Sequence, residues 1–160
     1  RHPNAILGLK LVFPKGQDGL ERIQSCGGLY DGGKHPYHRY INWRSDDPRV
    51  NVEEEVGWVT GAAFVVPSHI WQALNGLDEV YERGYFEDVD FCERAKRAGY
   101  EIWYCPGATF THHAGQSTQS MNLWEHVQAA RKFQHNRALF HKRWDSVIEP
   151  DIQGVFSPNT

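Results

Sequence analysis

Residues 85–105 read Tyr-Phe-Glu-Asp-Val-Asp-Phe-Cys-Glu-Arg-Ala-Lys-Arg-Ala-Gly-Tyr-Glu-Ile-Trp-Tyr-Cys, and this stretch decides the fold class. Apolar and small side chains recur at three- and four-residue steps between Glu87 and Ala98, which predicts a helix. Gly99 can adopt a positive φ angle and end that helix. Glu101–Cys105 is a short apolar run typical of a strand. A helix that leads directly into a strand indicates an α/β protein.

Outward from this stretch, the same alternation continues in both directions. Upstream, the sequence predicts a buried strand, a second apolar strand and a short helix that Ser68 caps. Downstream, it predicts a further extended piece and one or two amphipathic helices. These elements are Ala5–Phe13, Val56–Val66, Ser68–Leu74, Ala108–His112 and Leu123–Trp144. Residues 15–55 lack periodicity and are expected to form a long loop region with one short strand near Cys26–Tyr30.

Composition excludes several classes of protein. The chain has 160 residues, of which 40% are apolar and 23% are charged, so it can bury one core of ordinary size. No apolar run approaches the roughly 18 residues that a membrane span needs. The net charge of −3 and the scattered basic residues argue against a nucleic-acid partner. Three cysteines without a Cys-x-x-Cys pair favour a reducing, cytoplasmic location.

We interpret residues 1–149 as part of one domain and residues 150–160 as a loose tail, because the tail has no periodicity. The chain is short for an enzyme that must hold two substrates, and it begins with Arg1 just before an apolar run. We therefore expect it to be a piece of a longer protein.

Three carboxylates open the predicted helix at Glu87, Asp88 and Asp90. Acidic groups in a first helical turn face the free N–H groups and the positive end of the helix dipole, which orients them. An oriented carboxylate can remove a proton from a hydroxyl group that acts as a nucleophile. The alternative is that these acids only cap the helix and keep it soluble.

Five sequence motifs, in this order, resemble the C-terminal half of family 2 glycosyltransferases, and in particular the rhamnosyltransferase-like members. The motifs are Thr60-Gly61-Ala62, residues 75–79 (Asn-Gly-Leu-Asp-Glu), residues 86–99, Tyr104 to Ser117 and residues 136–140 (Asn-Arg-Ala-Leu-Phe). The resemblance covers about residues 5–144. It implies a partial GT-A (nucleotide-diphospho-sugar transferase) fold, with a mixed sheet and flanking helices.

The resemblance also implies roles for particular residues. Asp88 matches the family's catalytic base, with Glu87 beside it, and His112 matches a ligand of the Mn²⁺ or Mg²⁺ that neutralises the leaving diphosphate. The residues implied in donor or acceptor binding are Trp58, Gly61, Ala62, Tyr85 and Asp90. Core packing is an equal or better explanation for the aromatic members, and a single histidine is more often structural.

The triplet Asp88-Val89-Asp90 has the form of the Asp-x-Asp motif by which GT-A enzymes bind metal and nucleotide. In the family that motif ends a hydrophobic strand upstream of the position that matches Arg1, whereas this triplet begins a helix. We therefore do not interpret it as the metal motif.

The resemblance implies an inverting, metal-dependent transfer of a sugar from a nucleotide-diphosphate sugar, linked to UDP or dTDP, to a glycan or lipid-linked acceptor. Such an enzyme would serve polysaccharide or cell-envelope biosynthesis at the inner face of the membrane, as a peripheral protein. This chain alone is expected to be inactive. Two alternatives remain: a non-catalytic carbohydrate-binding or assembly module, and a small metalloprotein that uses His112, His113 and the acids at 87–90.

Overall fold

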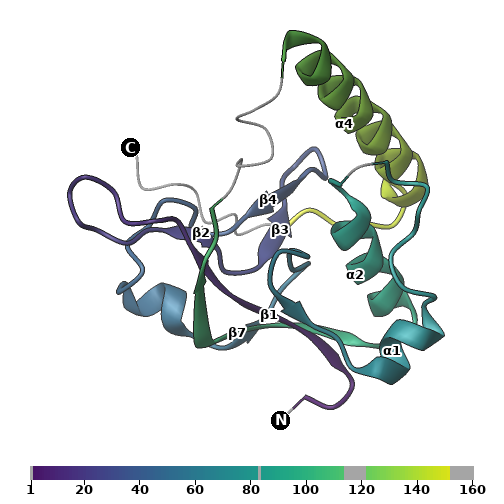
Figure 1. The fold of residues 1–160 in the computed structure, drawn as a ribbon. Helices are drawn as coiled ribbons and strands as arrows, with labels where there is room; N and C mark the ends of the chain where they lie inside the picture. The colour runs from purple at the N-terminus through teal and green to yellow at the C-terminus, as the bar shows by residue number, and fades with distance from the viewer. Residues whose placement is uncertain (1, 83, 114–121, 152–160) are drawn as a thin grey trace.

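The protein is an α/β structure in which a curled mixed sheet carries helices along one side (Figure 1). The computed structural model describes residues 2–82, 84–113 and 122–151. The predicted fold class, a mixed sheet with flanking helices, is confirmed.

Strand β1 (Ala5–Val12) lies at the centre of the sheet. Along one edge it pairs in parallel with β7 (Glu101–Thr111). Along the other edge it pairs in antiparallel fashion with β2 (Ile23–Ser25) and β6 (Phe64–Val65). Strand β5 (Glu54–Glu55) pairs with the outer edge of β7. A strand with neighbours on both sides explains the nearly continuous apolar sequence of β1.

Strand β7 unites two extended pieces that the sequence separates at Pro106. Its pairing with β1 runs from Glu101 to Cys105 and resumes at Thr109, so residues 106–108 bulge out of the ladder. Proline has no N–H to give to a ladder, so a bulge is where it fits within a strand. The bulge lets one strand continue to the edge of the candidate site.

The apolar run Val56–Val66 is not a strand along its length, contrary to the prediction. Only β6 pairs in the sheet, and residues 60–63 form a turn. Val56 and Val59 are nevertheless buried, because they pack into the core without joining the ladder. A short apolar run reports burial, and burial does not require a strand.

Three helices appear where the sequence predicts them: α1 (Ser68–Ala73), α2 (Glu87–Arg97) and α4 (Leu123–Trp144). The predicted cap of α1 is wrong, because Pro67 occupies the N-cap position and no side chain caps the helix. Helix α2 stops before Gly99, whose φ angle is 85°. The predicted first residues of the three helices match the structure, and the predicted last residues of α1 and α2 lie one residue too far along the chain.

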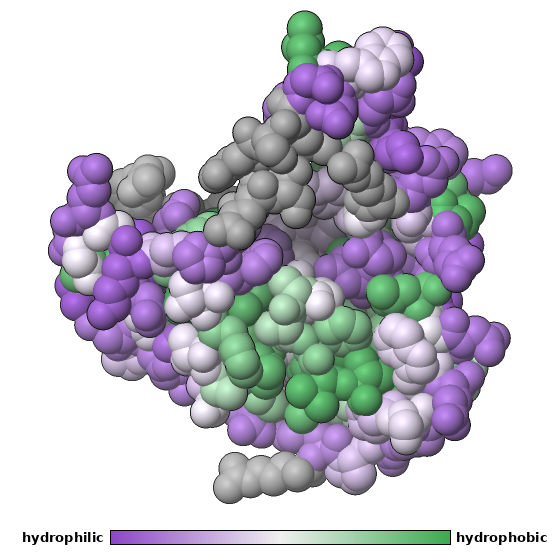
Figure 2. Space-filling model, in the orientation of Figure 1, coloured by the Kyte–Doolittle hydropathy of each residue, from purple (hydrophilic) through white to green (hydrophobic). Residues whose placement is uncertain are grey.

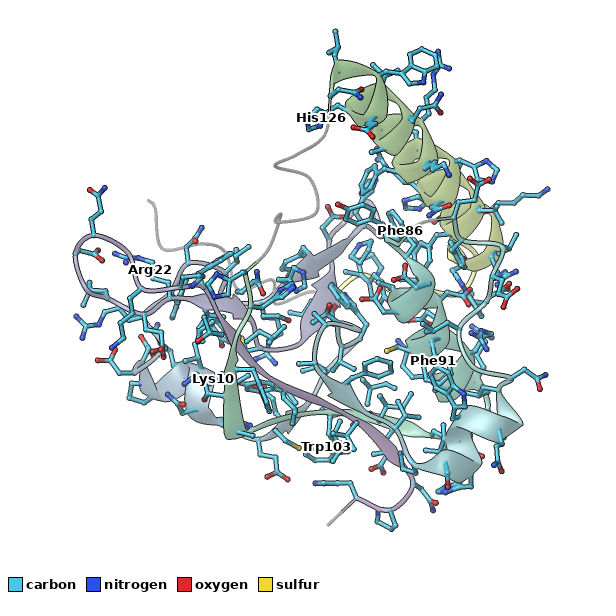
Figure 3. The ribbon with its side chains drawn as sticks, viewed as in Figure 1. Lys10, Arg22, Phe86, Phe91, Trp103 and His126 are labelled. Atoms are coloured by element: carbon cyan, nitrogen blue, oxygen red, sulfur yellow. The ribbon has the colours of Figure 1, made fainter. Side chains whose placement is uncertain are left out.

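Helix α4 is one continuous helix, and its two halves differ. Its start is closed by a capping box between Asn122 and Glu125. Its C-terminal half packs on the body through buried side chains that include Asn136 and Trp144. Its N-terminal end, marked by His126 in Figure 3, projects away from the sheet. Within the described parts of the chain, no helix has the length and apolar character that a membrane crossing requires.

The expected loop region of residues 15–55 contains a second small sheet, and the short strand predicted near Cys26–Tyr30 is confirmed as one of its two strands. Strands β3 (Gly28–Tyr30) and β4 (Pro36–His38) form an antiparallel hairpin. A 3₁₀ helix, η1 (Pro48–Asn51), follows and is capped by the Asp47 side chain. The hairpin places His38 beside the first turn of α2, as the site geometry below shows.

The start of the predicted loose tail is attached to the body. The Asp151 N–H donates to the Tyr30 carbonyl at 3.0 Å. The Tyr30 N–H donates to the Asp151 side chain at 2.6 Å. The rest of the predicted tail, residues 152–160, lies outside the described residues.

Candidate active site

A cleft of about 460 Å³ opens at the start of α2. Figure 2 shows this face, with apolar side chains gathered at its centre and the surface hollowed between them and α4. The wall combines residues from β4, from the turn at 60–63, from the first turn of α2 and from α4. The lining residues are Pro36, His38, Trp58, Thr60, Gly61, Ala62, Tyr85, Phe86, Glu87, Asp88, Val89 and Phe133.

A second cavity of about 390 Å³ adjoins the first. The two share a wall made of His38, Thr60, Ala62 and Tyr85. The second cavity is also lined by residues at the ends of β1, β2 and β7, among them Gln24 and His112. Asp88 and His112 therefore border two adjoining cavities.

Asp88 lies in the first turn of α2, and a backbone N–H holds each of its carboxylate oxygens. The Gly61 N–H donates to Oδ2 at 2.9 Å, and the Val89 N–H donates to Oδ1 at 2.9 Å. These bonds and the helix dipole favour a fixed carboxylate. Each oxygen retains lone-pair capacity for a further donor on the cleft side.

Glu87 borders the same cleft and is incompletely satisfied. Its Oε2 atom is buried and has no hydrogen-bond partner among the described residues. Burial, followed by the neighbouring charge of Asp88, raises the pKa of the Glu87 carboxyl above its ordinary value. An unpaired buried oxygen beside a cleft is available to a ligand hydroxyl.

The turn before α2 is strained. Gly84, Tyr85 and Phe86 all have positive φ angles, of 83°, 71° and 74°. For the two non-glycine residues this conformation costs on the order of 1–3 kcal/mol each. The result is that Tyr85 is 57% exposed on the cleft wall, whereas Phe86 turns into the core beneath α4 (Figure 3). Nothing in the sequence signals this conformation, because Tyr and Phe rarely adopt it.

Asp90 does not lie in the cleft, contrary to the expectation for a substrate-binding residue. Its side chain is 0% exposed and accepts four hydrogen bonds. The donors are Tyr81 Oη at 3.0 Å, Arg94 Nε at 2.8 Å, Arg143 Nη1 at 2.8 Å and Trp144 Nε1 at 2.9 Å. Two residues along a helix turn a side chain by about 200°, which places Asp90 on the face opposite to Asp88.

Trp58 is mainly a core residue. It is 4% exposed, and its Nε1 donates to the Leu29 carbonyl at 3.2 Å. A Cβ atom at Gly28 would lie 2.0 Å from the indole ring, so only glycine fits beneath it. One part of the ring still borders the cleft, where it packs against His38 with ring centroids 4.8 Å apart. The ring can therefore support a ligand, but it offers little free surface for stacking.

Gly61 and Ala62 form part of the floor of the first cavity, and Ala62 also lines the second. A Cβ atom at Gly61 would meet the Cβ of Asp88 and the Phe64 ring at 3.5 Å, which is ordinary contact. The fold does not need glycine here, so any requirement for it would come from a ligand.

His112 follows the end of β7, and its Nδ1 lies 2.7 Å from Gln24 Oε1. An amide oxygen only accepts hydrogen bonds, so this contact places the hydrogen on Nδ1 and leaves the Nε2 lone pair free. That tautomer is the one that a metal-binding histidine requires. The residues present thus fit one imidazole ligand. Among residues 2–82, 84–113 and 122–151, no three His, Cys, Asp or Glu side chains are grouped to hold a metal.

The metalloprotein alternative and the end of the histidine motif can each be compared with the described residues. The metalloprotein hypothesis requires His112 and the acids at 87–90 to converge, and no such group is found among the described residues. Ser117, at the end of the histidine motif, lies outside them.

Sequence reasoning missed His38. It lines both cavities, and its Nδ1 lies 3.0 Å from Ser25 Oγ. Burial lowers the pKa of His38, and the charge of Asp88 opposes that change only in part. The imidazole is therefore kept neutral beside a carboxylate. With nine histidines in the chain, only the β3–β4 pairing distinguishes this one.

Comparison with known proteins finds rhamnosyltransferases among the similar sequences. A rhamnosyltransferase named WbbL from Escherichia coli is 29% identical over 107 residues, 64% of this chain and 38% of that protein. The N-acetylglucosaminyl-diphospho-decaprenol L-rhamnosyltransferase of Mycobacterium tuberculosis is 38% identical over 66 residues, 41% of this chain and 21% of that enzyme. The chain resembles rhamnosyltransferases.

The predicted resemblance to rhamnosyltransferase-like glycosyltransferases is thereby confirmed. A protein of Sinorhizobium fredii described as uncharacterized protein y4gI is also similar, with 29% identity over 115 residues, 69% of this chain and 12% of that protein. No family model matches the chain. The chain spans 12% to 38% of the length of these three relatives.

Proposed function

We propose that this chain is the acceptor side of an inverting glycosyltransferase of the GT-A type, with Asp88 as the general base. The observation that carries the proposal is the position of Asp88. Its carboxylate lies on the wall of the cleft, and the N–H groups of Gly61 and Val89 fix it. A base must be oriented toward the space where the nucleophile binds, and Asp88 meets that requirement.

In the proposed reaction an acceptor hydroxyl attacks the anomeric carbon of the donor sugar. Its proton passes to Asp88 as the new C–O bond forms. The bond between the anomeric carbon and the diphosphate oxygen breaks, and the nucleoside diphosphate leaves with the electron pair. Glu87 accepts a hydrogen bond from a second hydroxyl of the acceptor through its unpaired oxygen.

The proposal includes one divalent cation, Mn²⁺ or Mg²⁺, which would supply Lewis-acid assistance to the departure of the diphosphate. His112 would bind it through Nε2, while Gln24 keeps the proton on Nδ1. An imidazole ligand favours Mn²⁺ over Mg²⁺.

We further propose a UDP- or dTDP-linked donor sugar and a glycan or lipid-linked acceptor, used in polysaccharide or cell-envelope synthesis. The name of the mycobacterial relative, which describes rhamnosyl transfer to an N-acetylglucosaminyl-diphospho-decaprenol, supports the lipid-linked acceptor. A cytoplasmic protein at the inner face of the membrane would meet such an acceptor. We propose that the part of the enzyme that binds the nucleotide lies outside these 160 residues, and that they do not convert substrate by themselves.

The test replaces Asp88 with Asn in the full-length protein. We expect kcat to fall about 10²- to 10⁴-fold, because the amide cannot take the proton. Measurement of nucleoside diphosphate release, with a rhamnosyl donor and a lipid-diphosphate glycan as acceptor, checks this. Asp18→Asn, at an exposed position distant from the cleft, is the matched control. Wild-type turnover in Asp88→Asn would remove Asp88 as the base.

A non-catalytic carbohydrate-binding module is the second candidate, and the aromatic residues of the cleft wall favour it. Titration of the full-length protein with nucleoside diphosphate, with and without Mn²⁺, separates the two. Binding that needs both the nucleotide and Mn²⁺ supports the transferase. Binding of glycan alone, without any effect of nucleotide or metal, supports the module.

A further inference from the structure

Asn136 connects the middle of α4 to the strained turn that precedes α2. Its side chain is fully buried, and all of its polar contacts are with backbone atoms of residues 82–85. The two hydrogens of its Nδ2 are shared among the carbonyl oxygens of Glu82 at 3.0 Å, Gly84 at 3.0 Å and Tyr85 at 3.1 Å. Its Oδ1 accepts from the Glu82 N–H at 3.2 Å. One side chain thus satisfies four backbone groups of a single turn.

The turn needs such a contact for a physical reason. Consecutive positive φ angles at Gly84, Tyr85 and Phe86 direct the carbonyls of residues 84 and 85 toward α4. Buried carbonyls without a donor are destabilising. No side chain caps the start of α2 either, because Phe86 occupies the N-cap position. Strained backbone persists only where its surroundings fix it, and here the surroundings are Asn136.

The Gly84–Phe86 turn sets the position of the candidate catalytic groups. Glu87 and Asp88 are the first residues of α2, directly after the strained residues. Tyr85 and Phe86 are also held from α4, because the Phe133 ring lies 5.4 Å and 5.5 Å from their rings. Phe133 and Asn136 are three residues apart and lie on the same face of α4.

We propose that Asn136 is a positioning residue: by holding the Gly84–Phe86 turn in its strained conformation, it fixes Asp88 and Tyr85 relative to the cleft. The inference rests on the proposed function for its catalytic consequence. Its structural consequence, a turn that opens when the amide is removed, does not depend on that function.

Asparagine is the residue that this position requires. An aspartate has the same size and keeps the acceptor for the Glu82 N–H, but it loses both amide hydrogens and places oxygen against three carbonyls. A leucine fills similar space and makes none of the four bonds. Asn136→Asp and Asn136→Leu therefore separate the hydrogen bonds from the packing.

The experiment compares these variants with Ile148→Ala in the full-length protein. Ile148 is a buried core residue and lies outside this contact, so its truncation lowers stability without touching the turn. The first measurement is the rate of chymotrypsin cleavage at Tyr85 and Phe86 under native conditions. We expect cleavage to accelerate at least about tenfold in both Asn136 variants relative to Ile148→Ala, compared at temperatures of equal global stability.

The second measurement is the split between kcat and KM. A displacement of a catalytic group on the order of 1 Å can reduce turnover about 100-fold. We expect such a loss of kcat in Asn136→Asp, with the KM of the nucleotide-sugar donor unchanged, and near wild-type kcat in Ile148→Ala.

The outcomes are separable. If both Asn136 variants resemble Ile148→Ala in cleavage and in kcat, the positioning role is overturned. If cleavage accelerates and Asp88→Asn retains wild-type turnover, the clamp on the turn stands and the proposed function fails. If cleavage accelerates, kcat is unchanged and Asp88→Asn is inactive, the turn does not position the base and the proposal is wrong.

Discussion

Two carboxylates in one helical turn have opposite environments. Asp88 faces the cleft and is held by two backbone N–H groups, so its oxygens remain open to a ligand. Asp90 faces the interior, where Tyr81, Arg94, Arg143 and Trp144 donate four hydrogen bonds to its carboxylate. The difference shows that a triplet of the form Asp-x-Asp at a helix start divides its two acids between a site and a structural network.

This division follows from helix geometry. Strand neighbours at positions i and i+2 share a face, so an Asp-x-Asp at the end of a strand can direct both carboxylates to one ligand. On a helix the same spacing separates them by about 200°. Asp88 and Asp90 therefore do not face one ligand together, as the two acids of an Asp-x-Asp motif at the end of a strand can.

The largest expected difference between the two acids is in their contribution to the free energy of unfolding. Asp90→Asn should lower the free energy of unfolding by about 3 kcal/mol, because it removes the buried carboxylate that pairs with Arg94 and leaves Arg143 with Asp78 as its remaining partner. Asp88→Asn should change stability by about 1 kcal/mol or less, since its charge borders the cleft. Urea unfolding of both variants measures the contrast.

The same pair of variants contains its own control. Each changes one oxygen to an NH₂ group on the same helical turn, so a general effect of removing acid from the helix start would appear in both. Equal losses of stability in the two variants would contradict the division between site and network.

The division between Asp88 and Asp90 also shows how far the sequence could lead. Periodicity and glycine ends predict α2 correctly, because an amphipathic helix is a local pattern. The role expected for Asp90 does not follow from that pattern, because its partners Tyr81 and Arg143 lie nine residues before it and 53 after it. Such a network exists only once α4 has docked.

Other elements divide in the same way. The central position of β1 follows from its continuous apolar run, and the structure confirms it. The strained turn at Tyr85–Phe86 and the approach of His38 to the cleft arise from tertiary contacts with Asn136 and Trp58. Intrinsic propensity argues against the first and is silent on the second, so neither could be predicted from the sequence.

A smaller effect is expected at Glu87, which tests the electrostatics of the cleft side. Burial raises the pKa of its carboxyl above the ordinary value of 4.5, so the folded state holds its proton to a higher pH than the unfolded state does. The free energy of unfolding therefore decreases as pH rises through the window that starts near pH 4.5. Glu87→Gln should remove this decrease and be more stable at pH 7 by a few tenths to about 1 kcal/mol, because solvent in the cleft screens the charge.

Urea unfolding of the wild type and Glu87→Gln at several pH values from 4 to 8 checks this sign, where that range is roughly the span over which such carboxyls titrate. Glu82→Gln is a suitable control, because the Lys132 ion pair lowers the pKa of Glu82 and its replacement should have the opposite pH dependence. A difference between wild type and Glu87→Gln that shrinks as pH rises would contradict the proposed environment.

The smallest effect on stability is expected at Gly61, where adding one methyl group tests whether a substrate contacts the cleft floor. Its φ angle is not in the positive region and a Cβ atom would make only ordinary contacts, so Gly61→Ala should change the free energy of unfolding by about 0.5 kcal/mol or less. The methyl group would nevertheless lie beside Asp88, on the floor of the first cavity. If a sugar approaches this floor, KM should rise about tenfold or more, because one misplaced methyl group can weaken binding by that much in a closely fitting pocket.

Ala62→Gly, which removes a methyl group from the same floor, is the matched control and should leave KM nearly unchanged. Steady-state kinetics of the full-length protein distinguish the two variants. If Gly61→Ala has wild-type KM and kcat, no substrate contacts this floor, and the ligand must then bind toward Tyr85 and His38 instead.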